Sequence, residues 1–159
     1  MKLKSLFGVL CLFVITFTVI SCKKDKAVLA SGSCSFSIDS TAYSANTASG
    51  YVEDTVGIGK KALTIQGMVG TLNSFLAVTI IFPDTLITGE FTEANHAFIL
   101  FSRNLSDKSA SWTSTSATIK ITSINSKYAE GTFAGILKNG DNETPLTDGK
   151  FKVNISNTN

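Results

Sequence analysis

Apolar and polar residues alternate with a period of two along much of this chain. Residues 63–66, 118–122 and 150–155 place an aliphatic or aromatic residue at every second position, with threonine, lysine, glutamine or asparagine between them. Successive side chains of a strand point to opposite faces of a sheet, so the alternation predicts strands with one buried face. After the N-terminal segment no helical period is convincing, and residues 91–96 predict a short turn at most.

Turn-forming residues separate the alternating segments, at Gly57-Ile58-Gly59, Pro83-Asp84, Asn139-Gly140-Asp141 and Asp148-Gly149. The best hairpin signal is Asn139-Gly140, between residues 132–138 and the run that starts at Thr144. Short strands with turns at this spacing predict an all-β domain. We expect either an antiparallel β-sandwich or a small up-and-down, lipocalin-like barrel.

Two segments, Phe75–Phe82 and Phe98–Phe101, are apolar on both faces. A strand of a two-layer sandwich has one wet face, so something must cover the second face of these segments. The candidates are another segment of the same chain, a second subunit, the membrane, or an apolar ligand inside a barrel. A covering segment of the chain itself is the commonest solution.

The pattern Gly-x-Phe occurs three times, at residues 89–91, 131–133 and 149–151. At strand spacing the glycine and the phenylalanine share one face of the sheet. An aromatic ring can lie over a strand glycine, which has no side chain of its own to pack. The alternative is coincidence in a chain with 12 glycines and 11 phenylalanines.

The first residues have the three parts of a secretory signal: a basic start at Met1–Lys4, an apolar run at Leu6–Ile20, and Ser21 before a cleavage point. That point falls on Cys22 and resembles the lipobox of bacterial lipoproteins, which implies that Cys22 is lipidated. An uncleaved membrane helix is the alternative, but the run has 15 residues where a span needs about 20. A cleaved signal without lipid is a third possibility.

This interpretation divides the chain into a lipoprotein signal helix at 1–21, a lipidated tether at 22–33 and a single β domain at 34–159. Two or more acyl chains give durable membrane anchoring, so the membrane is a predicted partner through Cys22. Similarity to Gram-negative sorting rules favours the outer membrane, because Lys23 rather than aspartate follows the cysteine. Whether the domain faces the periplasm or the cell surface stays open.

Removal of the signal changes the cysteine and charge arguments. Cys11 leaves with the signal, so Cys34 is left without a disulfide partner and is expected to be a small buried strand residue. Loss of Lys2 and Lys4 reduces the 14 basic residues to 12, which equals the number of acidic ones. A neutral chain with one arginine, Arg103, lacks the basic surface of a nucleic-acid-binding protein, so we expect no nucleic-acid partner.

Catalytic chemistry finds little support. His96 is the one histidine, with no second metal-binding residue nearby in sequence, so we expect neither a metal site nor a cofactor. Residues 57–62 superficially match a dinucleotide loop, but a strand rather than a helix follows. The acidic pairs Glu53-Asp54 and Glu90/Glu93 would need to meet in space. We therefore expect no enzyme and no catalytic residue.

Trp112 stands alone in a serine and threonine tract. An indole on a β-surface can stack on a sugar ring, whereas most tryptophans are largely buried in a core. Burial is the commoner outcome.

Four stretches, residues 21–25, 119–123, 130–133 and 147–151, together resemble the small outer-membrane lipoproteins of unknown function of the Bacteroidota. The family supplies no established active site. What the resemblance and the residues together predict is a lipid-anchored cell-envelope protein with a non-catalytic β domain that binds a small apolar ligand or a glycan. The alternative is a structural lipoprotein that contacts an envelope protein and holds no small molecule.

Overall fold

The computed structural model describes residues 32–55, 59–70 and 73–157. The predicted signal peptide, Cys22 and the tether up to residue 31 lie outside the described residues. The described residues contain nine strands and two short 3-10 turns: β1 (Gly32–Ile38), β2 (Thr41–Asp54), β3 (Lys61–Val69), β4 (Ser74–Ile81), β5 (Gly89–Thr92), η1 (Glu93–Asn95), β6 (Ala97–Ser102), η2 (Lys108–Ala110), β7 (Ser111–Asn125), β8 (Tyr128–Asn139) and β9 (Asn142–Asn157).

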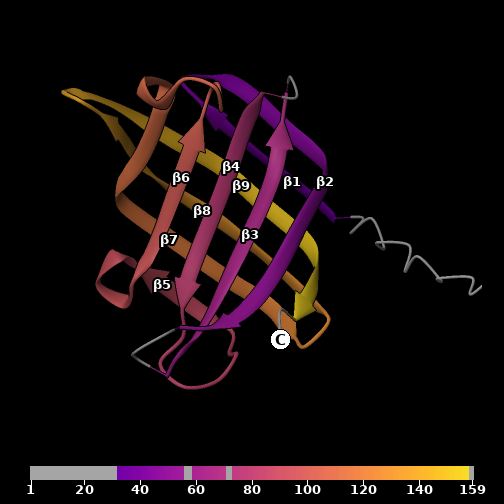
Figure 1. Ribbon diagram of the computed structural model, residues 1–159. Helices are drawn as coiled ribbons and strands as arrows, with labels where there is room; N and C mark the ends of the chain where they lie inside the picture. Colours follow the sequence, from indigo (N-terminus) through magenta and orange to yellow (C-terminus); the bar gives the residue numbers. More distant parts are fainter. Residues whose placement is uncertain (1–31, 56–58, 71–72, 158–159) are drawn as a thin grey trace, which may run out of the picture.

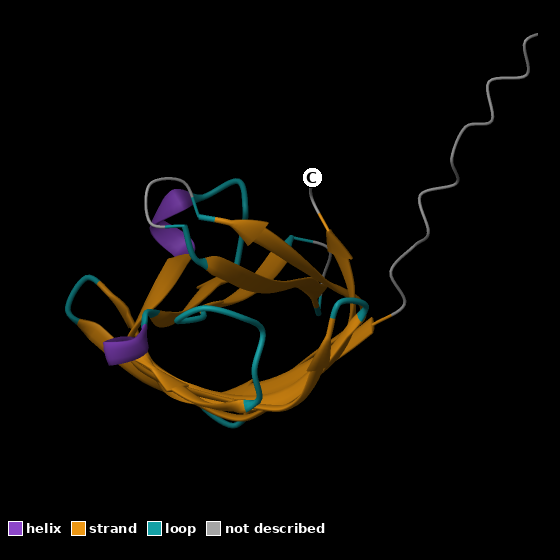
Figure 2. Cartoon of the chain, turned by 90° about the horizontal axis from the view of Figure 1, so that it is seen from below, coloured by secondary structure: helices purple, strands orange, loops and turns teal. Residues whose placement is uncertain are grey.

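The strands form one sheet that closes on itself (Figures 1 and 2). Around the ring the order is β1, β2, β3, β4, β6, β7, β8 and β9, and β9 returns antiparallel to β1. The short β5 pairs with β7 beyond the end of β6. The all-β class is therefore confirmed, and of the two expected architectures the chain adopts the antiparallel up-and-down barrel.

The predicted strands are found where the alternation places them. Residues 63–66 lie in β3, 118–122 in β7 and 150–155 in β9. Asn139 pairs with Asn142 across the β8–β9 turn, where Gly140 has a φ of 59°. A left-handed backbone of this kind is the conformation that favours glycine in tight hairpins. The turn predicted at Asp148-Gly149 is wrong, because both residues lie within β9, where Asp148 has a φ of 56° and the register with β8 shifts.

Alternate side chains of the strands fill the barrel interior. They include an aromatic cluster: the ring of Phe36 lies 5.2 Å from that of Tyr43, 5.6 Å from that of Phe101 and 6.0 Å from that of Phe133, between centroids. Aliphatic residues of β3, β4 and β6 surround the cluster. The segments Phe75–Phe82 and Phe98–Phe101 are apolar on both faces, and the residues on one of these faces belong to the core. These residues are fully buried: Leu76, Val78, Ile80, Ile99 and Phe101.

The residues on the other face of these two segments point away from the core. Thr79 of β4 pairs with Thr64 of β3, and their hydroxyls lie 3.1 Å apart in a hydrogen bond. Both threonines are buried, whereas Phe98, the neighbour of Thr79 on β6, is 42% exposed. The outward face of β3, β4 and β6 is therefore buried at the two threonines but exposed to solvent at Phe98.

Two of the three Gly-x-Phe repeats pair with each other. Gly131 of β8 lies opposite Phe151 of β9, and Phe133 lies opposite Gly149. Each glycine therefore faces the phenylalanine of the other repeat. In the third repeat, a Cβ atom built on Gly89 would lie 3.8 Å from the ring of Phe91 on the same strand.

β1 begins at Gly32, so Gly32 and Ser33, which the sequence assigns to the tether, are already paired in the sheet. Cys34 is buried among the core residues, as the sequence predicts. Desolvation by burial raises the pKa of its thiol to about 11, although a backbone hydrogen bond with Ala45 acts in the opposite direction. The thiol is therefore protonated at neutral pH.

Candidate functional site

A polar groove runs over the outer face of the barrel at β1, β8 and β9, and we call it the β1–β9 groove. It consists of two adjoining hollows of about 490 and 290 Å³, which share Ser33, Asn46 and Lys152. Most of the residues that line the hollows carry hydroxyl, amide or charged side chains: Ser33, Ser35, Ser44, Asn46, Thr122, Tyr128, Glu130, Thr132, Lys150, Lys152 and Asn154.

The register of the sheet places these side chains in rows across the strands. In one row Lys150 of β9 lies between Thr132 of β8 and Ser35 of β1, and Ser44 of β2 follows Ser35. These four residues are exposed while their neighbours Cys34, Phe36 and Phe151 are buried, as the period of two requires. The groove therefore uses the solvent-facing half of the strands whose other half builds the core.

The next row carries a paired charge. The Lys152 ammonium lies 4.0 Å from a Glu130 carboxylate oxygen and 5.6 Å from the centre of the Tyr128 ring. The Tyr128 hydroxyl donates a hydrogen bond to that same carboxylate. This hydrogen bond raises the pKa of Tyr128, because loss of the phenolic proton would bring two negative groups together.

Lys150 differs from Lys152 in its charge environment. Within the part of the chain that the structure describes, no acidic side chain lies within ion-pair distance of Lys150. The groove lining thus contains two ammonium groups and one carboxylate. Its net charge is positive by one, although the mature chain is expected to be neutral.

His96, the sequence's one imidazole, is exposed between η1 and β6 with a φ of 57°. It lines a smaller hollow of about 230 Å³ with Lys60, Glu90 and Phe91. In the same region Glu93 accepts a hydrogen bond of 3.1 Å from the Ala117 backbone N–H, which lowers the pKa of the Glu93 carboxyl. Glu93 therefore has a structural partner in β7.

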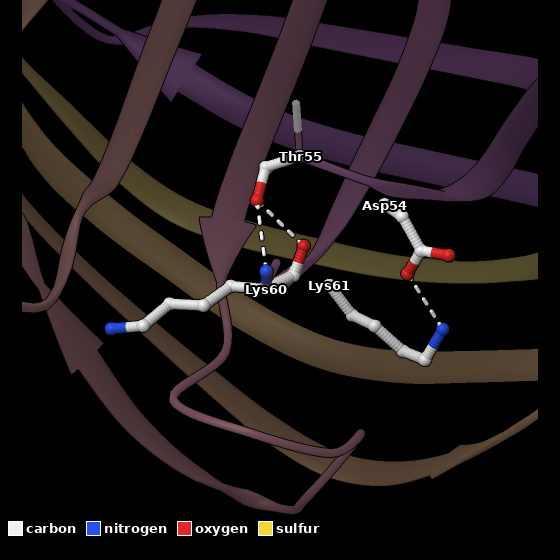
Figure 3. Close-up of polar contacts among 4 residues, drawn as sticks. All are labelled: Asp54, Thr55, Lys60 and Lys61. Atoms are coloured by element: carbon white, nitrogen blue, oxygen red, sulfur yellow. Dashed lines mark hydrogen bonds and ion pairs between the residues drawn. The ribbon is translucent and has the colours of Figure 1, made fainter. Parts of the chain in front are cut away.

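The candidate dinucleotide loop joins β2 to β3, and Figure 3 shows its ends. The Thr55 hydroxyl donates to the Lys60 carbonyl at 2.6 Å and accepts from the Lys60 N–H at 3.2 Å. Lys61 forms an ion pair of 2.8 Å with Asp54. Strand β3 begins at Lys61, so the helix that a dinucleotide loop needs is replaced by a strand, as expected from the sequence. Residues 56–58 lie outside the described residues.

Trp112 is partly buried and packs against the core, with the Arg103 guanidinium 5.5 Å from its ring centre. A cation over the indole occupies a face on which a sugar would stack. The structure therefore favours the packing role over the stacking role for this residue.

None of the groove residues was predicted from the sequence to be a binding residue. Ser35, Thr132 and Lys150 are ordinary polar positions of alternating strands, and only the pairing of β9 with both β8 and β1 brings them together. A strand pattern specifies which residues face outward but not which strands are neighbours.

A comparison with protein families, curated proteins and solved structures found no match. In the residues that the structure describes, no group of three histidine, cysteine, aspartate or glutamate side chains is placed to hold a metal ion. Nor does any helix within those residues have the length and hydropathy needed to cross a membrane.

Proposed function

We propose that this protein is an outer-membrane lipoprotein whose barrel binds a glycan, without catalysis, in the β1–β9 groove. The observation that carries the proposal is the lining of the groove. Hydroxyl, amide and ammonium groups from five neighbouring strands, β7, β8, β9, β1 and β2, line it together with the ring of Tyr128. Such a set of donors and acceptors suits a polyhydroxylated ligand, which exchanges hydrogen bonds with water for hydrogen bonds with the protein.

The side chains that fill the barrel interior favour a glycan on the outer surface over an apolar ligand inside the barrel. The rings of Phe36, Tyr43 and Phe101 contact one another, with centroids 5.2 to 5.6 Å apart, and Phe36 and Phe101 are buried in the core. An eight-stranded barrel has an interior that side chains can fill. The apolar strands thus supply core packing, and the polar hollow on the outside supplies the binding volume.

The position of the groove suits a ligand near the membrane. Gly32 and Ser33, the last two residues of the predicted tether, line it. Gly32 is ten positions after Cys22, and an extended chain spans at most about 33–36 Å over ten residues. A lipid on Cys22 would therefore keep the groove close to the glycan-bearing envelope.

The test uses the full-length protein in detergent on an array of immobilised saccharides. We expect binding to a subset of them, and we expect Ser35→Tyr to abolish it because the ring would fill the hollow. Ser37→Tyr is the matched control, since Ser37 lies on the same strand outside the groove lining. Absence of binding by the wild-type protein, or equal binding by Ser35→Tyr, would refute the proposal.

A second function, contact with an envelope protein, has one observation in its favour. The outward side chains of β3, β4 and β6 carry no charge, and they include Phe75, Ile81, Phe98 and Leu100. This face lies on the opposite side of the barrel from β8 and β9 (Figure 1). Leu100→Lys should release a partner cross-linked in intact cells if the face is an interface, and leave cross-linking unchanged if it is not.

A further inference from the structure

We infer that the glycan of the β1–β9 groove is acidic, and that Lys150 binds its acid group. The inference rests on the proposed function and adds the chemical class of the ligand. It follows from the different surroundings of the two lysines in the groove, from the side chains that flank Lys150, and from the net charge of the lining.

Lys152 already has an anionic neighbour in the protein. Its ammonium lies 4.0 Å from Glu130, whose carboxylate also accepts the Tyr128 hydroxyl. A ligand anion at Lys152 would meet the Glu130 charge at short range, and like charges repel there. Lys152 and Glu130 together therefore offer a neutral, polar surface that suits the hydroxyl groups of a sugar.

Lys150 offers an uncompensated ammonium. No carboxylate of the described residues lies within ion-pair distance of it. Its neighbours across the sheet are Thr132 on β8 and Ser35 on β1, and both carry hydroxyl groups. An ammonium flanked by two hydroxyls can give one acid group three donors, which is the arrangement that charge-assisted hydrogen bonds favour.

The same row adds positive charge beyond the groove. Lys120 of β7 lies opposite Thr132, on the side away from Lys150. Glu90 is paired opposite Lys120 on β5 and offsets part of its charge. The excess positive charge within the lining is therefore centred on Lys150, and the hollow of about 490 Å³ beside it leaves room for a sugar ring.

The experiment compares saccharides that differ only in charge. Full-length protein in detergent is titrated with uronic acid oligosaccharides and with the same oligosaccharides as methyl esters, together with any neutral saccharide that the array identifies. The esters keep every hydroxyl and lose the negative charge. We expect the acids to bind about fivefold more tightly, which corresponds to the upper end of an exposed ion pair. Raising the salt from 50 to 500 mM should reduce this preference.

Lys150→Gln should remove the preference for the acid while retaining the binding of the ester. Lys108→Gln, which changes a lysine in η2 outside the groove lining, should leave the preference unchanged. Equal binding of acid and ester by the wild-type protein, or a preference that survives Lys150→Gln, would overturn the inference and leave glycan binding intact. Absence of all saccharide binding would instead overturn the proposed function.

Discussion

Phe151 lies over Gly131, on the neighbouring strand of the barrel, in the space that a side chain at that position would take. A Cβ atom built on Gly131 would be 2.7 Å from Cζ of the Phe151 ring and would also collide with the Lys120 carbonyl oxygen. The reciprocal pair obeys the same geometry, since a Cβ on Gly149 would lie 2.6 Å from the Phe133 ring. The Gly-x-Phe repeats of β8 and β9 are therefore a packing device in which each ring covers the other strand's glycine.

Gly131→Ala is expected to destabilise the protein by about 2–3 kcal/mol, because overpacking forces side chains and backbone to shift. Urea denaturation measures the loss. Ala134→Ser, an exposed change on the same strand, should alter stability by less than about 0.5 kcal/mol. Part of the cost of Gly131→Ala should vanish in a Phe151→Leu background. An undiminished cost there would show that the ring is not the cause.

Phe36→Ala is expected to cost about 3–5 kcal/mol, because it removes a large side chain at the centre of the aromatic cluster and leaves a cavity. Phe36 contacts three rings from three other strands. Phe98→Ala, which truncates an exposed phenylalanine, should cost much less. Thermal unfolding of the two variants compares them, and similar losses would contradict the assignment of Phe36 to the core.

Cys34 should make stability depend on pH in the alkaline range. Its thiol has a pKa of about 11 in the folded protein against 9.0 when exposed. Below pH 9 both states keep the proton and the thiol adds no pH dependence. Above pH 9 the unfolded chain releases the proton first, so stability falls as the pH rises toward 11. The wild-type protein should lose about 1 kcal/mol more than Cys34→Ala between pH 8 and pH 10. Equal losses would argue against the raised pKa.

Cys22→Ala should release the protein from the membrane fraction of the cells that express it, because the proposed lipid anchor needs the thiol. Fractionation followed by immunoblotting measures the distribution. Cys34→Ala should remain in the membrane fraction. A Cys22→Ala protein that still sediments with membranes would contradict lipidation.

The strands and the fold class could be predicted because the period of two is a local signal. Segments such as 118–122 and 150–155 show this period within their own residues. The turn at Gly140 is also a local signal, because the dipeptide Asn139-Gly140 predicts it. The choice between sandwich and barrel could not be made, since it depends on whether the last strand pairs with the first. The pairing of Lys150 with Ser35 that decides it joins residues from the two ends of the domain.

The groove could not be predicted from the sequence either, because it also depends on which strands are neighbours. Tyr128 and Lys152 each look like solvated surface residues, and only the alignment of β8 with β9 places the ammonium over the ring. Conversely, the residues that the sequence suggested for catalysis or sugar binding were chosen for their chemical type, and the structure places them outside the β1–β9 groove. His96 is an exposed loop residue, and Trp112 is a packing residue with a cation over it.

Closure of the barrel by β9 also constrains how the protein reaches its native state. Contacts between residues so distant in sequence form slowly, because the loop-closure entropy must be lost before they contribute stability. β1 has its neighbour β2 at once, but its other edge stays unpaired until the final strand has been made. If the chain is exported from its N-terminus, the proposed lipidation site arrives first and the strand that completes the ring arrives last. The edge of β1 that β9 covers in the native barrel would then stay unpaired until the end of export, which makes it the edge most open to pairing with another chain.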